Sequence, residues 1–247
     1  MRFRGAMAAF LLAMTFLIPA VPAASQTVTS DQILELFDRA ALGGKDRING
    51  QVYRWQGAAT VRFTGAAAVR HLDWTRNQLA DLSALTGLDL QVVDTIGADI
   101  LVVFVDRFDD VLSGRYNALI DEFVAGPERR EALLAGFRKA GAVCAGQIVA
   151  TGSTLSGGIV LIPRDQLSPV VRSCISAQLS RVMGLPFAAP ENAISVLASG
   201  SPYSHTTVLD KLVLRLLYHP RMKAGLGRED ALTIARSVMP ELLTSPN

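Results

Sequence analysis

Short runs of β-forming residues alternate with segments of helical periodicity from residue 52 onward. Residues 52–63, 88–93 and 100–105 are rich in β-formers, whereas 66–85 carries apolar residues at helical spacing. Alternation with a period of two favours a strand, and apolar residues three or four apart favour a helix. Only a short turn separates 88–93 from 100–105, so we expect these strands to be neighbours. The order of elements predicts a mixed α/β domain of the α+β class, with helices packed on a sheet.

The second half of the chain continues this alternation and closes with helices. Residues 143–150 and 157–162 flank a stretch rich in Gly, Ser and Thr, which is typical of a β-hairpin. A loop rich in Pro, Ala, Ser and Gly follows over 185–205, and loops of this length are often functional. Helices are predicted over 30–42, 109–124, 128–140, 169–183, 206–218 and 228–242.

The first 25 residues have the layout of a secretory signal peptide. Arg2 and Arg4 precede an uncharged apolar stretch over 5–19, and small residues follow it. We expect cleavage after Ala23 or after Ser25; the alternative is an uncleaved membrane anchor. The mature protein would be periplasmic or secreted, with no stable membrane span. The predicted organisation is a signal peptide over 1–25, an N-terminal helix and linker over 26–50, and a single zincin-like domain over 51–242.

The charge balance argues against one class of partner. The 247-residue chain has 24 Lys and Arg against 22 Asp and Glu, and two of the arginines belong to the predicted signal peptide. The mature chain would therefore carry equal numbers of positive and negative side chains. Proteins that bind duplex nucleic acid present a broad basic face, so no nucleic-acid partner is expected.

The chain has two cysteines, Cys144 and Cys174. An even number of cysteines in an exported protein predicts a disulfide. Closing a loop of about thirty residues would stabilise the fold by about 3 to 4 kcal/mol if chain entropy dominates. Two unpaired buried thiols are the alternative, and a metal site would lack ligands.

Familiar catalytic motifs are absent from the sequence. Residues 141–146 begin and end with glycine but lack the Lys-Ser/Thr that completes a phosphate-binding loop. Ser153 and Ser156 lack glycine at both second neighbours, so neither sits in a nucleophile elbow. No two histidines are four residues apart, the usual spacing of zinc ligands on a helix. No cofactor and no metal are expected. The three histidines are His71, His205 and His219.

One strand and helix resemble the active-site segment of zincin metalloproteases. A strand over Gly157–Pro163 precedes a helix that ends at Gly184–Leu185, which is the order found in those enzymes. Alignment on that dipeptide gives Ala177 and Arg181 the positions of the two zinc ligands, and Gln178 that of the general base. Alanine has no donor atom, arginine keeps its proton and glutamine cannot act as a base. The resemblance implies a zincin-like scaffold that has lost its metal chemistry.

A series of short motifs extends over roughly residues 55–230. They are Trp55, Cys144-Ala-Gly-Gln147, Arg172-Ser173-Cys174, Met183-Gly-Leu-Pro186, Asn192-Ala-Ile-Ser195, His205-Thr-Thr-Val-Leu-Asp210, Leu216-Leu-Tyr-His-Pro220 and Gly225. Their order and spacing resemble a family of exported bacterial proteins catalogued as domain of unknown function 2927. That family usually has Glu-Glu-x-x-Gln in the helix, where this chain has Ala177-Gln178-Leu-Ser-Arg181. The resemblance implies the fold and export, and the departure makes residual hydrolase activity a weaker expectation.

These residues support a binding hypothesis and an enzymatic alternative. The first is an exported non-catalytic protein that binds a peptide, an envelope protein or a cell-wall component between the strand at 157–163 and the helix. The alternative is a zinc-independent periplasmic hydrolase that uses Asp210, Glu191 and a histidine as acid and base. A structural role in envelope assembly is a third interpretation. Candidate groove residues are Arg172, Gln178, Arg181, Asn192, Ser195 and Asp210.

Overall fold

A five-stranded sheet forms the centre of the protein, with the strand order β2-β1-β3-β5-β4. The structure is a computed structural model that describes residues 28–45, 47–65, 69–124, 127–140, 144–163 and 168–244. The predicted signal peptide over 1–25 lies outside the described residues. The strands are β1 (Ala59–Gly65), β2 (Leu90–Val92), β3 (Ile100–Val105), β4 (Ala145–Thr151) and β5 (Thr154–Pro163). With the helices around it, this sheet confirms the mixed α/β class.

The sheet is parallel except for its last strand. β1 pairs with β2 and β3, and β3 pairs with β5, all in parallel. β4 and β5 are antiparallel and are joined by a turn at Gly152 and Ser153, which confirms the predicted hairpin. β4 and β2 are therefore the two edges of the sheet.

The expectation that 88–93 and 100–105 are neighbouring strands is wrong, because β1 lies between β2 and β3. All six residues of β3 are buried, whereas Gln91 and Val92 of β2 are exposed. A strand that is apolar along its whole length buries both of its faces and belongs inside a sheet. β3 therefore takes a central position and the short β2 forms the edge.

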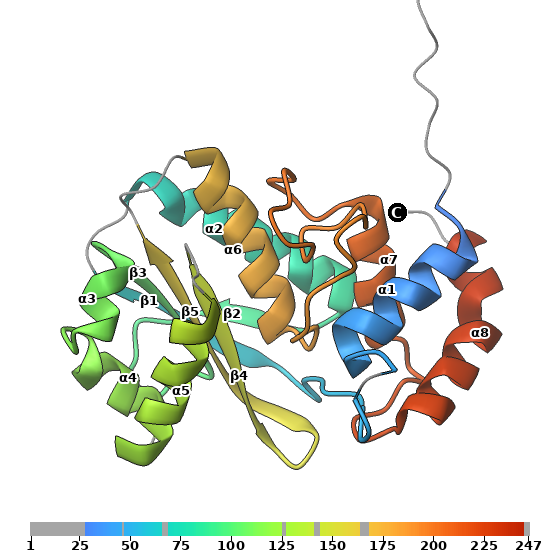
Figure 1. Ribbon diagram of the computed structural model, residues 1–247, viewed down its shortest axis with the longest axis horizontal. Coiled ribbons are helices and arrows are strands. Elements are labelled where there is room, and N and C mark those ends of the chain that lie inside the picture. The colour runs from blue at the N-terminus through green and yellow to red at the C-terminus, as the bar shows by residue number, and fades with distance from the viewer. Residues whose placement is uncertain are drawn as a thin grey trace, which may run out of the picture.

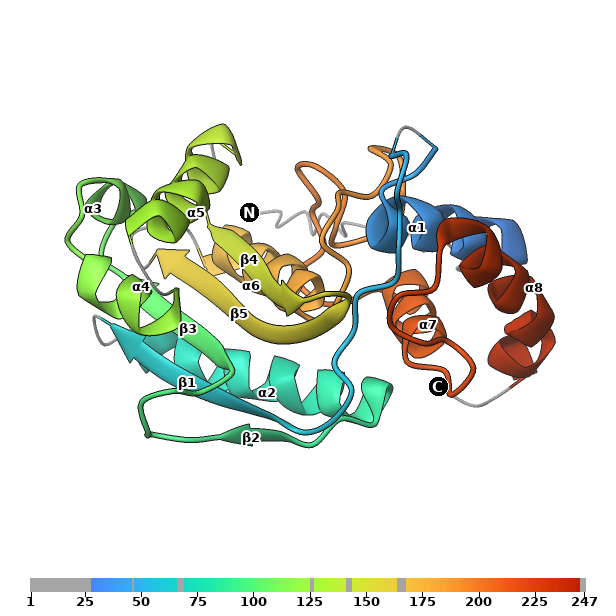
Figure 2. The ribbon, with the colours of Figure 1, turned by 90° about the horizontal axis from the view of Figure 1, so that it is seen from below.

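The two faces of the sheet face separate hydrophobic cores. Ile100 of β3 belongs to the larger core and the next residue, Leu101, to the second. The second core also contains residues of three helices that lie on one side of the sheet in Figures 1 and 2. These helices are α3 (Phe108–Leu112), α4 (Asn117–Phe123) and α5 (Pro127–Ala140); α2 (Val69–Thr86) and α6 (Ser168–Val182) cover the other face.

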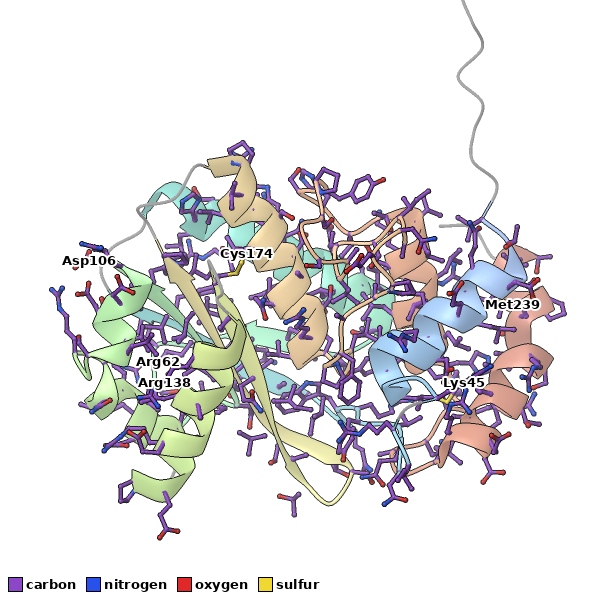
Figure 3. All side chains as sticks on the ribbon, in the orientation of Figure 1. Lys45, Arg62, Asp106, Arg138, Cys174 and Met239 are labelled. Carbon is purple, nitrogen blue, oxygen red and sulfur yellow. A yellow bond between two sulfur atoms is a disulfide. The ribbon has the colours of Figure 1, made fainter. Side chains whose placement is uncertain are left out.

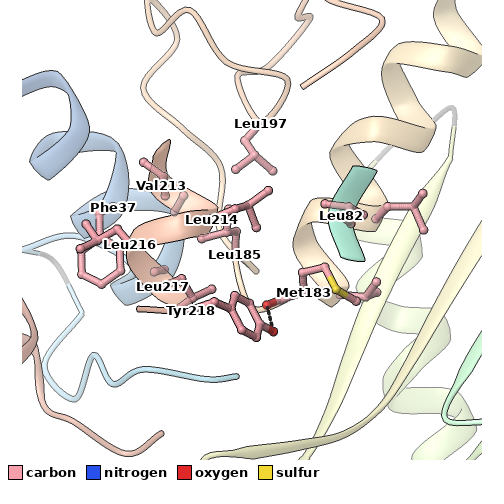
Figure 4. Close-up of a cluster of buried hydrophobic side chains, with 14 of the residues drawn as sticks. Phe37, Leu82, Met183, Leu185, Leu197, Val213, Leu214, Leu216, Leu217 and Tyr218 are labelled. Atoms are coloured by element: carbon pink, nitrogen blue, oxygen red, sulfur yellow. Dashed lines mark hydrogen bonds between the residues drawn. The ribbon is translucent and has the colours of Figure 1, made fainter. Parts of the chain in front are cut away.

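Three further helices pack together beside the sheet in Figure 1: α1 (Ser30–Leu42), α7 (Val208–Leu217) and α8 (Arg228–Thr244). α1 begins with a capping box in which Thr29 and Gln32 satisfy each other's backbone N–H groups. Figure 4 shows Phe37 of α1 and Leu216 of α7 in one apolar cluster with Met183. The helices beside the sheet therefore share the larger core with α6.

Only the end of the strand predicted over 52–63 is part of the sheet. β1 begins at Ala59, and the preceding segment makes only isolated bridges, one of them from Arg54 to Thr154. Trp55 turns inward, where its Nε1 donates to the carbonyl oxygen of Val182 at 2.9 Å. The segment before Ala59 alternates like a strand because some of its side chains, such as Trp55, face inward against the end of α6. Inward-facing side chains produce this alternation with or without a neighbouring strand.

The single helix predicted over 109–124 is divided in two. α3 ends at Leu112 and α4 begins at Asn117. Between them Gly114 adopts a φ of 91°, in the left-handed region. Glycine reaches this region without steric cost and commonly ends helices. The apolar periodicity continued across this break and concealed it.

Candidate functional site

One face of α6 borders a cavity of about 620 Å³. Pro169, Ser173, Ala177 and Arg181 line this cavity at intervals of four residues. Residues four apart lie on one face of a helix. The opposite wall is formed by residues between 196 and 202, which belong to the loop drawn in orange in Figure 1.

A second cavity, of about 360 Å³, lies at the C-terminal end of α6. It is lined by the edge strand β4 and by Arg47, Tyr53 and Phe187. Arg181 lines both cavities, so they adjoin at this side chain. We call the two cavities together the α6 cleft. Its walls are α6, β4, the loop residues between 196 and 202, and the three side chains Arg47, Tyr53 and Phe187.

Arg181 is a partly buried cation without a counter-ion in the cleft. Its Nε is buried and has no hydrogen-bond partner. Among the described residues, no Asp or Glu lines either cavity. Burial lowers the pKa of the Arg181 guanidinium, although an arginine remains charged in proteins. The cleft therefore has a positive group where its two cavities adjoin.

Gln178 is another polar residue of α6 in the cleft. Its side chain is 5% exposed, and its Oε1 has no hydrogen-bond partner. Gly146 of β4 lies against it, so that a Cβ at position 146 would be 2.8 Å from this oxygen. The missing side chain of Gly146 makes room for Gln178 between the helix and the edge strand.

A disulfide between Cys144 and Cys174 connects the start of β4 to α6, which confirms the predicted pairing. The two Cα atoms are 6.1 Å apart. Figure 3 shows the bond of Cys174 beside α6, and this residue also lines the larger cavity. The disulfide therefore fixes the edge strand to the helix that forms the floor of the cleft.

Ser195 and Asp210 lie next to the cleft wall but line neither cavity. The carboxylate of Asp210 accepts hydrogen bonds from the Ser195 hydroxyl at 2.5 Å and the Val196 N–H at 3.0 Å. It also accepts from the N–H and the hydroxyl of Thr207, which precedes α7. These bonds tie the loop of the cleft wall to the N-terminus of α7.

The remaining candidate residues are on the surface. Arg172 is exposed on α6 and Asn192 is exposed in the loop, and neither lines the cleft. Of the six residues selected from the sequence, the structure brings Gln178 and Arg181 together in the cleft. It pairs Ser195 with Asp210 outside it.

Within the residues that the structure describes, no hydrogen bond or ion pair joins Asp210 or Glu191 to His205 or His219. Asp210 is fully buried and bonds to the loop and the cap of α7, whereas Glu191 is exposed. His205 contacts Ser204 and Trp74 instead. His219 lies 3.5 Å from Glu241. In the described part of the chain, no group of three or more His, Cys, Asp or Glu side chains could hold a metal ion.

Several residues that line the cleft were not predicted from the sequence. Arg47 and Tyr53 lie in the segment after α1, and Phe187 lies in the loop after α6. The guanidinium of Arg47 stacks over the Phe187 ring, 4.5 Å from its centroid. Such contacts join segments far apart in sequence and leave no local pattern. The position of Gly146 beside the helix could be predicted, because the expected disulfide places β4 there.

Comparison with known proteins identifies a family for the chain. A family model with the description "Protein of unknown function (DUF2927)" matches residues 31–237. No curated protein matches the chain.

Proposed function

Since the chain belongs to this DUF2927 family, whose description assigns no activity, we propose a function from the cleft itself. The α6 cleft is a non-catalytic binding site for an extended polypeptide segment. The observation that carries this proposal is the position of an edge strand along a cleft that contains unpartnered polar groups.

β4 offers the backbone groups that such a ligand needs. In the described part of the chain, its only neighbouring strand is β5, on one side. An unpaired strand edge binds extended peptides by adding a strand, while adjoining pockets select side chains. The larger cavity supplies such a pocket, with Val170, Val196 and Pro202 among its walls.

The helix face supports binding without catalysis. Ala177, Gln178 and Arg181, which the zincin resemblance aligns with the ligands and base of a metalloprotease, all line the larger cavity. None of the three can supply a zinc ligand of the usual kind or a general base. We propose that a metalloprotease-like scaffold has kept its cleft and changed its use.

Export of the protein to the periplasm or the medium is part of the proposal. The disulfide is compatible with an oxidising compartment. No helix within the described residues has the length and apolar character needed to cross a bilayer. A partner of the cell envelope or a secreted peptide would meet the protein there.

The test is selection from a pool of random octapeptides on the immobilised, disulfide-intact protein. We expect enriched peptides to be recovered uncleaved, as measured by mass spectrometry. The best binder should slow hydrogen exchange of β4 backbone amides. No enrichment, protection elsewhere, or cleavage of the bound peptides would contradict the proposal.

A pair of variants tests whether the peptide binds in the α6 cleft. Ala177→Phe places a large side chain in the cleft and should weaken binding at least tenfold. Ala188→Phe is the control, because Ala188 is exposed and lines neither cavity. Thermal unfolding of both variants checks that the fold is retained. Equal affinities in two folded variants would place the ligand outside the cleft.

A further inference from the structure

We propose that the polypeptide bound in the α6 cleft presents a carboxylate to Arg181, with an apolar side chain in the larger cavity beside it. This inference rests on the proposed function and specifies its ligand. The shared chemistry is a peptide carboxylate, which either the C-terminus or an Asp or Glu side chain can provide.

The first argument is the unpaired charge of Arg181. A desolvated cation is costly unless it has a partner. Two other arginines of this protein have such partners. Arg228 makes two bonds to the carboxylate of Asp38, at 2.6 and 2.7 Å. Arg54 donates to three backbone carbonyls around the end of α7. Arg181 has no acid in the cleft, and a carboxylate of the bound peptide would supply this partner.

The second argument is the charge of the surroundings. Arg47 lines the smaller cavity together with Arg181. Stacking on Phe187 restrains the guanidinium of Arg47. Two cations without an acid among the lining residues give a local positive potential, although the chain as a whole is nearly neutral. The planar guanidinium group matches a carboxylate with two parallel hydrogen bonds.

The third argument is the acceptor beside this cation. Oε1 of Gln178 is buried and lacks a donor. Gln178 and Arg181 are three residues apart on α6 and both line the larger cavity, so they are neighbours on the helix surface. A peptide residue offers an N–H group close to a carboxylate, which satisfies both side chains at once. An inorganic anion without a donor group, such as sulfate, would satisfy only Arg181.

The fourth argument is the apolar lining of the larger cavity, which Arg181 also lines. Pro169, Val170, Val196, Ala198 and Pro202 contribute to the larger cavity. Apolar walls around a few polar groups are typical of sites that orient a ligand by its polar atoms and bury an apolar side chain. The carboxylate therefore fixes the position of the peptide, and the cavity selects its neighbouring residue.

The experiment uses four octapeptide pools on the disulfide-intact protein. The pools have either a free C-terminal carboxylate or a C-terminal carboxamide, each with or without Asp and Glu. We expect the amidated pool that lacks Asp and Glu to be retained at least tenfold less than the best of the other three. The pool that is retained identifies the source of the carboxylate.

Variants of the helix show whether Arg181 reads that carboxylate. Arg181→Gln should abolish the difference between the pools, and Arg181→Lys should preserve part of it. Arg172→Gln is the matched control, because Arg172 is an exposed arginine of the same helix outside the cleft. Thermal unfolding confirms that the three variants are folded.

The outcomes separate this inference from the proposed function. Retention of all four pools, with protection of β4, would overturn the carboxylate and leave the polypeptide site standing. The same conclusion follows if Arg181→Gln discriminates as well as Arg172→Gln. No retention of any pool would overturn both proposals.

Discussion

The hydroxyl of Ser195 donates a 2.5 Å hydrogen bond to the buried carboxylate of Asp210, which lies in the first turn of α7. The same carboxylate accepts the N–H groups of Val196 and Thr207. A helix-capping residue of α7 therefore also holds the loop that forms one wall of the α6 cleft. This pair supports the loop from outside the two cavities.

Asp210→Ala should lower the free energy of unfolding by about 3 kcal/mol, because it leaves several buried donors without an acceptor. Asp210→Asn should cost less. The amide oxygen can still accept the N–H groups of Val196 and Thr207, and its nitrogen can donate to the Ser195 oxygen. Urea unfolding at pH 7 measures both changes. An equal loss in the two variants would show that the hydrogen bonds of Asp210 are not what stabilises the loop.

The titration of Asp210 should appear in the pH dependence of stability. Burial raises the pKa of this carboxyl above its ordinary value of 3.8, and its hydrogen bonds offset part of that effect. The folded chain therefore holds this proton more tightly than the unfolded chain does. The stabilising contribution is complete below pH 3.8 and is lost as the pH rises through the raised pKa.

The measurement is the difference in unfolding free energy between the wild type and Asp210→Asn, from pH 3 to pH 7. We expect the difference to move against the wild type as the pH increases. A constant difference, or one that moves in favour of the wild type, would show that the pKa of Asp210 is not raised.

Arg181→Met should raise the free energy of unfolding by about 1 kcal/mol while weakening peptide binding. Its side chain fills a similar volume and removes a partly buried charge that has no counter-ion in the cleft. Arg172→Met, at an exposed position of the same helix, should change stability by no more than about 0.5 kcal/mol. Thermal and urea unfolding compare the two. A loss of stability in Arg181→Met would indicate that the guanidinium supports the fold.

Removal of the Cys144–Cys174 disulfide should lower the free energy of unfolding by about 3 to 4 kcal/mol, since the bond closes a loop with a sequence separation of 30. A Cys144→Ser/Cys174→Ser double variant gives this value without a reductant. Backbone amides of β4 should also exchange faster with solvent. Adding a reductant should destabilise the wild type and leave the double variant unchanged. An effect on both proteins would show that the reductant acts on a group other than this disulfide.

Gly184→Ala should destabilise the fold by more than about 3 kcal/mol. Gly184 has a φ of 109°, and an added Cβ would lie 2.3 Å from the carbonyl oxygen of Tyr53. Gly200→Ala is a matched control, since Gly200 also has a positive φ, 66°, but an added Cβ meets nothing within 4 Å. Strain alone should cost this control about 1 kcal/mol. Similar losses in both variants would show that the contact with Tyr53 is not decisive.

Local patterns were sufficient to predict most of the elements. The capping residues and apolar spacing indicated α1, and the turn residues indicated the hairpin of β4 and β5. These signals are local because they arise from backbone hydrogen bonds between residues close in sequence. The break at Gly114 escaped prediction because glycine is tolerated within a helix and its left-handed conformation is not visible in the sequence.

The cleft could be predicted only in part. Gln178 and Arg181 were selected because they depart from a known motif, and both line the cleft. Ser195 and Asp210 were selected for the same groove but bond to each other outside it. A polar residue in a loop has the same sequence signature whether it binds a ligand or caps a helix, so the residue type alone does not separate the two roles.

The sequence by itself determined the fold class, the pairing of the two cysteines and the helix that carries Gln178 and Arg181. Each follows from residue types, or from spacing along one segment. Only the tertiary structure decided that β1 separates β2 from β3, that β4 borders the cleft and that Arg47 and Phe187 join Arg181 there. These arrangements depend on which surfaces are buried together, and burial is shared among segments far apart in the chain.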